Sequence, residues 1–210
     1  MVEIHNVEQK TLEWFQLKLG KIGGSTFKNF INLDGKLKSN SVLIGHIAGI
    51  IAEIETGMAS DQSDFESDAM AHGNEYEPIC LEKYFTNSHL RKVGWATNPK
   101  YKHAGISPDA VYFDLGKYNT GLEIKCPTSK VQIKRFIEDK IPNEYLPQIL
   151  MYFLIFEDIQ VMTFASFDPF NEKRELFKKI VSRSQLALQL ENANKSLLAI
   201  DKLIDKHLIK

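Results

Sequence analysis

Two short β-rich segments in the middle of the chain constrain its fold more than any other feature. Residues 110–113 are Ala-Val-Tyr-Phe, and residues 121–126 alternate between two kinds of side chain until Pro127 ends the run. The polar stretch 114–120 between them is typical of a turn, so the block predicts a β-hairpin. Helical patterns precede this hairpin, and helical and strand patterns alternate after it. The chain therefore predicts an α/β or α+β fold with helices around a mixed central sheet.

Helical spacing of apolar residues accounts for much of the remaining chain. Ser25 is a candidate N-cap for a short helix that follows it. Pro78 lies inside a longer helical pattern and predicts a kink or a boundary there, and the polar, acidic stretch 59–64 predicts a loop. The other predicted helices are at residues 12–19, 42–55, 69–85, 130–138, 144–156 and from 184 to the end, with strands near 92–93, at 159–167 and at 174–181.

The length and composition are those of an ordinary globular protein. The chain has 210 residues, of which 43% are hydrophobic and 25% are charged, so it can bury a core without disulfides. We expect one domain over residues 1–210, with a helical N-terminal part at about 1–88 and a C-terminal helix at about 184–210. The two cysteines, Cys80 and Cys126, are too few for a multi-cysteine zinc ribbon or a four-cysteine iron–sulfur cluster.

The N-terminus and the apolar runs indicate a protein that stays inside the cell. Residues 1–6 contain no basic region followed by an apolar core, so we expect no signal peptide. The longest apolar run, around residues 48–52, is far too short to cross a bilayer. We therefore expect a cytoplasmic protein without a membrane partner. The net charge of −1 argues against a surface coated in positive charge, but it allows a local basic groove that binds nucleic acid.

Two acids and a lysine gather around the predicted hairpin. Glu123 and Lys125 project from the same strand face, because alternate residues of a strand share a face. Asp109 stands at the start of the partner strand, where we expect its carboxylate beside that of Glu123. Two adjacent carboxylates repel each other unless a cation lies between them, and hard oxygen ligands suit Mg²⁺ or Mn²⁺. The backbone carbonyl of Ile124 is a further candidate ligand. Such a site predicts phosphodiester hydrolysis, with Lys125 near the attacking water and the phosphate.

A simpler interpretation explains these residues without chemistry. A surface hairpin with a Glu123–Lys125 ion pair, and Asp109 in a Pro-Asp turn, needs no metal, and a Glu-x-Lys sequence alone is common. The flanking residues favour the metal site, because Ser107 and Pro108 before Asp109, and the Cys-Pro pair at 126–127, complete a longer known pattern.

That longer pattern resembles the lambda exonuclease and YqaJ-type viral recombinase family, within the PD-(D/E)xK nuclease superfamily. Residues 105–110, Gly-Ile-Ser-Pro-Asp-Ala, and residues 121–127, Gly-Leu-Glu-Ile-Lys-Cys-Pro, carry the superfamily signature. The resemblance covers about residues 14–169 and implies a restriction-endonuclease-like core. Three more segments resemble family motifs in the right order, at residues 14–25, 73–78 and 145–152.

The resemblance implies roles for individual residues at the site. The metal would be held by Asp109, Glu123 and the Ile124 carbonyl, with Glu77 as a further acid that acts directly or through water. Gln148 would orient the attacking water or hold the catalytic lysine in place. Without the resemblance, Glu77 would be interpreted as a solvated helix residue and Gln148 as an ordinary polar residue of an amphipathic helix. The implied catalytic residues are Asp109, Glu123, Lys125, Gln148 and Glu77.

A second group of residues resembles the family's site for a terminal 5′-phosphate. Lys18 and Ser25 occupy the corresponding positions, with Ser107 as a helper. A helix cap and an anion site use the same backbone N–H groups, so both interpretations of Ser25 are compatible. The family's best-known member has arginine in place of Lys18. Because lysine cannot form the bidentate fork, the phosphate would be bound less tightly here or shared with Lys21. Other basic residues near the predicted site are candidates for contact with the DNA backbone, although an ordinary charged surface explains any single one of them better. They are Lys102, His103, Lys130, Lys134 and Arg135.

The family resemblance also implies an activity and partners. It implies stepwise hydrolysis of one strand of double-stranded DNA from its 5′ end, which leaves a 3′ overhang for recombination by single-strand annealing. It further implies a ring-shaped homotrimer, a single-strand annealing protein as partner, and a phage or prophage gene expressed in the host cytoplasm. The residues alone predict only phosphodiester hydrolysis. Two alternatives remain: a structure-specific or restriction-type endonuclease, and a catalytically inactive DNA-binding relative.

Overall fold

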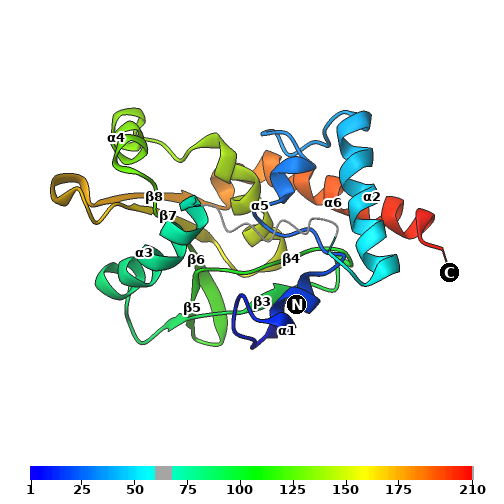
Figure 1. The fold of residues 1–210 in the computed structure, drawn as a ribbon, viewed down its shortest axis with the longest axis horizontal. Coiled ribbons are helices and arrows are strands. Elements are labelled where there is room, and N and C mark those ends of the chain that lie inside the picture. Colours follow the sequence, from blue (N-terminus) through cyan, green and yellow to red (C-terminus); the bar gives the residue numbers. More distant parts are fainter. Residues whose placement is uncertain (60–67, 210) are drawn as a thin grey trace.

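The computed structural model describes residues 1–59 and 68–209. Within them, the chain forms two β-sheets surrounded by helices (Figure 1). In the larger sheet, the β6–β7 pair is parallel and the other pairs are antiparallel, which confirms the predicted mixed sheet. The smaller sheet has the order β1 (Glu3–His5), β3 (Trp95–Thr97), β4 (Gly105–Ile106). The larger sheet has the order β2 (Leu90–Arg91), β5 (Ala110–Asp114), β6 (Lys117–Lys125), β7 (Val161–Phe167), β8 (Leu176–Ser182).

The helices lie close to their predicted positions. Helix α3 continues through Pro78, so this proline does not end the helix. Helix α4 and the connection between β7 and β8 lie at one end of the long axis of the molecule, and α2 and the C-terminal part of α6 lie at the other (Figure 1). The α-helices are α1 (Leu12–Lys18), α2 (Asn40–Thr56), α3 (Asp68–Tyr84), α4 (Ser129–Glu138), α5 (Leu146–Ile155) and α6 (Ala187–His207). Short 3-10 turns are η1 (Phe27–Asn29), η2 (Asn143–Tyr145), η3 (Glu172–Arg174) and η4 (Ser184–Leu186).

The two faces of strand β6 lie in different environments. Leu122 and Ile124 are buried in an apolar cluster with residues of α3, such as Cys80 and Leu81. Glu123 projects to the other face, which is covered by α5. Residues 147–155 of α5 are all buried, as is typical of a helix that is apolar on nearly every side. The few polar side chains of this helix can therefore bond only to protein partners, and Gln148 and Tyr152 bond to Glu123 of β6.

The β5–β6 hairpin is tighter than the sequence predicted. Only Leu115 and Gly116 form the turn, with φ angles of +48° and +80°. Positive φ at both central positions is typical of a type I′ turn, whose twist matches that of the flanking strands. The prediction that residues 114–120 form the turn was wrong, because 117–120 belong to β6. Exposed and half-buried residues alternate along this outer end of the strand, so polar side chains are tolerated there.

Local predictions in the first hundred residues were less accurate. Ser25 does not cap a helix; only the three-residue turn η1 follows, and the Thr26 hydroxyl, not that of Ser25, bonds to the Gly23 N–H at 3.0 Å. The strand expected near residues 92–93 is split between β2 and β3, and β1 was not predicted. The loop predicted at 59–64 lies, except for its first residue, outside the described residues. None of the helices in the described parts of the chain is both long and apolar enough to cross a membrane.

Candidate active site

The candidate site lies where the pairing between β5 and β6 stops. The last paired residues are Ala110 and Leu122. Beyond them, Pro108 has no N–H to continue the ladder. The Asp109 carboxylate takes the place of a backbone partner, because its Oδ2 accepts a hydrogen bond from the Ile124 N–H at 2.5 Å. The end of the ladder thus holds Asp109 next to the strand that carries Glu123, as the hairpin predicted.

Glu123 is held by three donors. Its side chain is fully buried, and its Oε1 accepts a hydrogen bond from Gln148 Nε2 at 2.7 Å. The hydroxyl of Tyr152 donates to its Oε2 at 2.8 Å, and the Lys125 ammonium forms an ion pair with Oε1. A buried carboxylate is stable only when its oxygens are satisfied in this way. The orientation of Glu123 is therefore set by β6 and α5 together.

Burial and neighbouring charges shift the pKa values of Asp109, Glu77 and Lys125. Burial raises the pKa of Asp109 well above its usual range, and the charges of Glu123 and Glu77 raise it further. Burial also raises the pKa of Glu77, which lies on α3, and the Lys125 ammonium opposes that rise. Burial alone would lower the pKa of Lys125, but Glu123 and Asp109 hold it above its ordinary value. The site therefore concentrates negative charge that a cation would stabilise.

The oxygen atoms of the site fit a hard divalent cation only in part. The oxygens of Asp109 and Glu123, with the carbonyl of Ile124, are of the kind that Mg²⁺ prefers. In residues 1–59 and 68–209, however, no three His, Cys, Asp or Glu side chains are grouped closely enough to hold a metal ion. The Lys125 ammonium, paired with Glu123, supplies the positive charge in this structure. The residues therefore fit a metal bound through two side chains and water, with Glu77 next to Asp109.

A second cluster connects α1 to the segment that precedes Asp109. The indole N–H of Trp14 donates to the Ser107 hydroxyl at 2.8 Å and to the Gly94 carbonyl at 2.9 Å. The Lys18 ammonium lies 3.6 Å from the centre of the Trp14 ring, and burial lowers the pKa of Lys18 to about 8. Trp14 therefore contacts both Lys18 and Ser107, and Ser107 is two residues before Asp109.

The structure brings Ser25 near the site but directs Lys21 away from it. Ser25 is exposed and follows Gly24, where an added Cβ would lie 3.3 Å from the Gln148 side chain. The Lys21 ammonium instead donates to the Lys102 carbonyl at 2.5 Å. Lys102 itself pairs with Asp205 of α6, on another part of the molecule.

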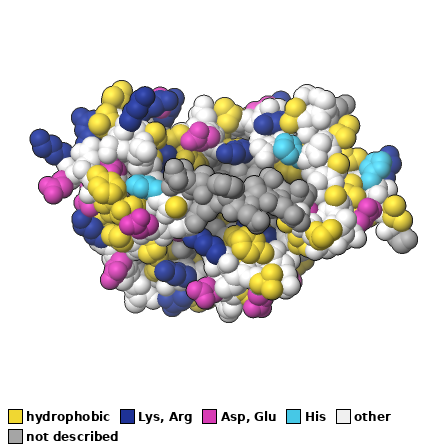
Figure 2. All heavy atoms as spheres, in the orientation of Figure 1, with side chains coloured by type: hydrophobic (Ala, Val, Ile, Leu, Met, Phe, Trp, Pro, Cys, Tyr) yellow, Lys and Arg dark blue, Asp and Glu magenta, His cyan; other side chains and the backbone are white. Residues whose placement is uncertain are grey.

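Two of the other basic candidates for DNA contact are buried. Arg135 is only 3% exposed, and its guanidinium bonds to Ser166 and Tyr145. His103 is 4% exposed and bonds to Asp205. Both were wrong as backbone contacts, because these partners hold them inside the fold. Lys130 and Lys134 are exposed, and the face in Figure 2 shows basic side chains scattered among acidic ones rather than in one coat.

The sequence motifs assigned no role to two tyrosines beside Glu123 and Lys125, Tyr152 and Tyr145. Tyr152 is fully buried, and burial and the Glu123 charge raise its pKa well above its usual range, so the hydroxyl keeps the proton that it donates. The Tyr145 ring centre lies 5.7 Å from the Lys125 ammonium. The spacing of four residues from Gln148 to Tyr152 was the available signal, since such residues share a helix face.

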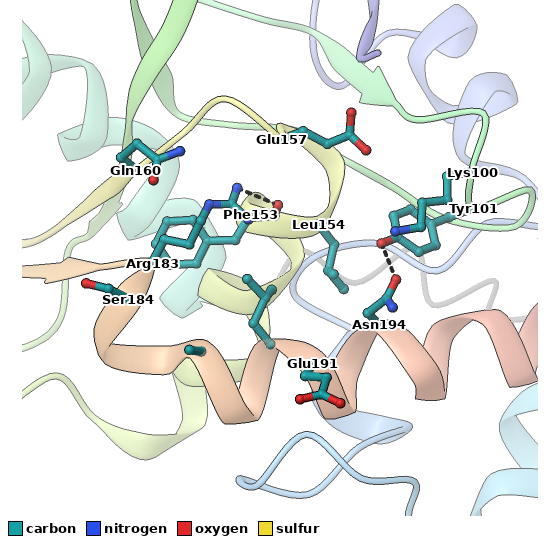
Figure 3. Close-up of a pocket in the computed structure, with 12 residues that line it drawn as sticks. Lys100, Tyr101, Phe153, Leu154, Glu157, Gln160, Arg183, Ser184, Glu191 and Asn194 are labelled. Carbon is teal, nitrogen blue, oxygen red and sulfur yellow. Dashed lines mark hydrogen bonds between the residues drawn. The ribbon is translucent and has the colours of Figure 1, made fainter.

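Another pocket, of about 590 Å³, is lined by none of the predicted site residues (Figure 3). Its arginine, Arg183, donates to the Phe153 carbonyl at 2.8 Å and to the Phe156 carbonyl at 2.9 Å. These carbonyls belong to the end of α5, which a basic side chain stabilises. Across the pocket, the Tyr101 hydroxyl donates to Asn194 at 2.8 Å. Because Arg183 is committed to backbone carbonyls, we assign this pocket a structural role.

The fold and the site define a mixed α/β protein whose central hairpin presents two acids and a lysine where its ladder ends. The chain belongs to the YqaJ-like viral recombinase domain family, whose model matches residues 13–157. This match confirms the family predicted from the motifs.

Solved structures support the same grouping. The alkaline exonuclease LHK-Exo from Laribacter hongkongensis is 25% identical, with a TM-score of 0.72 over 93% of this chain and 95% of that chain. The structure of LHK-Exo in complex with dAMP matches over the same shares, with 25% identity and a TM-score of 0.73. A phage-related exonuclease from Haemophilus somnus 129PT is 14% identical, with a TM-score of 0.51 over 89% of this chain and 96% of that chain, and it supports the fold alone. No curated protein matches the chain.

Proposed function

We propose that the chain is a Mg²⁺-dependent deoxyribonuclease that hydrolyses one strand of duplex DNA from its 5′ end and leaves a 3′ overhang. The observation that carries the proposal is the placement of Asp109 and Glu123 at the broken end of the hairpin ladder, with Lys125 paired to Glu123. Membership of the family and the likeness to LHK-Exo, an alkaline exonuclease, support the same activity. Mn²⁺ is expected to substitute for Mg²⁺, because both accept hard oxygen ligands.

Each side chain of the site would have its own role in hydrolysis. A bound Mg²⁺ would polarise the phosphodiester and lower the pKa of an attacking water. Asp109 and Glu123 would hold it, and Gln148 and Tyr152 keep Glu123 in one orientation. In this structure Lys125 is a cation, so its part is to stabilise the negative charge that develops on the phosphate oxygens and to position the water. The attack forms a new oxygen–phosphorus bond and breaks the bond to the leaving oxygen.

The position of Lys18, Ser25 and Ser107 supports a preference for 5′-phosphorylated ends. Trp14 joins Lys18 to Ser107, which is two residues before Asp109, and Ser25 follows Gly24, where an added Cβ would lie 3.3 Å from Gln148. A cation and hydroxyls on this side of the carboxylates suit a terminal phosphate. Lys21, whose ammonium is bonded elsewhere, would join them only after a rearrangement.

The test is digestion of duplexes labelled at one end or the other, with and without a 5′-phosphate, in Mg²⁺. We expect label to be released first from 5′ ends, and faster when they are phosphorylated. Initial release from 3′ ends would overturn the polarity. Cutting of covalently closed circles would identify an endonuclease, and binding without cleavage would identify an inactive relative.

Matched variants test the site itself. Asp109→Ala and Lys125→Ala are expected to abolish cleavage, whereas Lys117→Ala, on the same strand at the exposed hairpin end, should cleave normally. Circular dichroism must show that the variants are folded. Full activity of Lys125→Ala would contradict its role.

The proposed assembly is a homotrimeric ring around DNA, which works with a single-strand annealing protein in phage-type recombination in the host cytoplasm. The support is family membership. Light scattering should give three times the 24.0 kDa of one chain, and a stable mass of one chain would contradict the ring.

A further inference from the structure

A groove of about 570 Å³ opens directly onto the acids of the site. Glu77 and Asp109 form part of its wall, and residues 6–10 of the N-terminal segment form another part. Two lysines, Lys10 and Lys92, line the same groove. A volume of this size is typical of pockets that hold small ligands.

Lys10 lines the groove and has an unusual backbone conformation. Its φ angle is +71°, in the left-handed region that costs a residue with a side chain roughly 1 kcal/mol. Its ammonium donates to Asn74 Oδ1 at 2.5 Å, and Asn74 lies three residues before Glu77 on α3. Residues three apart lie on the same helix face. Burial raises the pKa of Glu77, and the charges of Lys125 and Lys10 oppose that rise, so Lys10 lies within electrostatic reach of the acid.

The segment that carries Lys10 is fixed to the core rather than free. Gln9 Nε2 donates to the carbonyls of Val93 at 2.9 Å and Pro108 at 3.1 Å. Gly94 lies so close to the segment that an added Cβ would be 1.9 Å from the Val7 carbonyl oxygen. These contacts attach the segment next to Pro108, the residue before Asp109. A strained residue on a fixed segment indicates a position that the fold maintains.

We propose that Lys10, with Lys92, binds a phosphate group of the substrate strand or of the released nucleotide in this groove. The inference rests on the proposed nuclease function. Glu8 is a third acid of the groove, beside Glu77 and Asp109. A phosphate there needs nearby cations to offset repulsion by the acids, and two lysines line the groove. Lysine suits this role as a point charge. Residue 10 lies before the matched span 13–157, so the family match assigns it nothing.

The test measures DNA affinity by fluorescence anisotropy in Ca²⁺ over a range of salt concentrations. Each phosphate contact that is lost lowers the slope of log affinity against log salt by about 1. We expect this decrease for Lys10→Met, and a normal slope for Lys10→Arg and for the exposed hairpin control Lys117→Met. Asn74→Ala removes the partner of Lys10 but keeps its charge, so it should also keep the slope. An unchanged slope for Lys10→Met together with unchanged inhibition by dAMP, or an equal decrease in slope for Lys117→Met or Asn74→Ala, would overturn the proposal.

Inhibition of cleavage by dAMP in Mg²⁺ distinguishes the two sources of phosphate. Weaker inhibition of Lys10→Met than of the unmodified protein would assign the subsite to the released nucleotide. Equal inhibition together with the lower slope would assign it to the DNA backbone. If the unmodified protein binds DNA in the anisotropy assay but never cleaves it, the proposed function fails while the slope still tests Lys10. If it does not bind DNA at all, both are overturned.

Discussion

At the residue scale, the carboxylate of Glu123 depends on donors that come from a different element. Strand β6 sets where the side chain starts, but Gln148 and Tyr152 of α5 set where its oxygens point. Lys125, on the same strand, forms an ion pair with Glu123. A second cation that approaches Glu123 repels the ammonium and weakens this ion pair. The two α5 donors are neutral, so they can hold the carboxylate with or without a competing cation. This makes Tyr152 a positioning residue whose removal should affect turnover.

For Tyr152→Phe, we predict that kcat falls about tenfold with little change in KM. The ring still fills its site, but Glu123 loses one donor, and a buried acceptor left without its partner costs about 1–3 kcal/mol. Tyr101→Phe is the matched control, because it also removes the hydrogen bond of a buried tyrosine, to Asn194, outside the site. Both variants should unfold at lower urea concentrations, but only Tyr152→Phe should lose turnover. A Tyr152→Phe enzyme with normal kcat would refute the positioning role.

Lys18 predicts a pH dependence of the preference for 5′-phosphate. Burial lowers the pKa of this ammonium to about 8, so the free protein carries its charge below that pH and loses it as the pH rises above it. The ratio of kcat/KM for phosphorylated and unphosphorylated ends should therefore fall between about pH 7 and 9. Lys18→Arg keeps its charge throughout this range, so its ratio should stay flat. A ratio that falls equally in both proteins would show that another group titrates.

At the element scale, the turn of the β5–β6 hairpin contains an avoidable strain. Leu115 is 94% exposed, and its φ of +48° is unfavourable for leucine. We predict that Leu115→Asn raises the free energy of unfolding by about 0.5–1 kcal/mol, because Asn-Gly is the preferred pair in a type I′ turn. Urea unfolding measures this change, and cleavage should be unaffected. A lower unfolding midpoint would show that Leu115 makes a contact that outweighs the strain.

The same hairpin shows which features of the site could be predicted from the sequence and which could not. The alternation along β6 was enough to predict that Glu123 and Lys125 share one face of the strand, because strand geometry is local. The hairpin pairing then predicted Asp109 beside Glu123, at the start of the partner strand. The turn itself was misplaced, because leucine gives no signal for positive φ. Ser25 was misjudged for a similar reason: a single turn of 3-10 helix has no periodicity that distinguishes it from the start of a longer helix.

The packing of α5 against β6 could not be predicted from local sequence patterns. Gln148 and Glu123 are 25 positions apart in sequence, and their contact depends on how the helix packs on the sheet. Only the family resemblance placed Gln148 at the site. Nothing in the sequence signalled Lys10, because its position follows from a fixed N-terminal segment and a strained backbone angle. These are properties of the assembled fold and cannot be read from spacing.

At the scale of the whole molecule, the site collects charge from distant parts of the chain. Glu77 comes from α3, Asp109 precedes β5, and Glu123 lies on β6. Burial raises the pKa values of Asp109 and Glu77, and the charges of Glu123 and Glu77 raise that of Asp109 further. A carboxyl whose pKa is higher in the folded state than in the unfolded chain destabilises the fold above its ordinary pKa of about 4. That cost is relieved as the pH falls through the raised values, or when a cation binds.

Mg²⁺ should therefore stabilise the folded protein without any substrate. A ligand that binds only the folded state at ten times its Kd adds about 1.4 kcal/mol, which corresponds to a rise of about 3–5 °C in Tm for a chain of this size. We predict this rise at pH 8 by calorimetry, and a smaller one near pH 5, where protons compete for the acids. Ca²⁺ should act similarly, because it takes the same oxygen ligands. Asp109→Asn should be more stable than the unmodified protein in EDTA and gain little from Mg²⁺, whereas Asp34→Asn, an exposed acid paired with Lys36, should respond normally. An equal rise in Tm for both variants would place the cation elsewhere and remove the basis of the metal site.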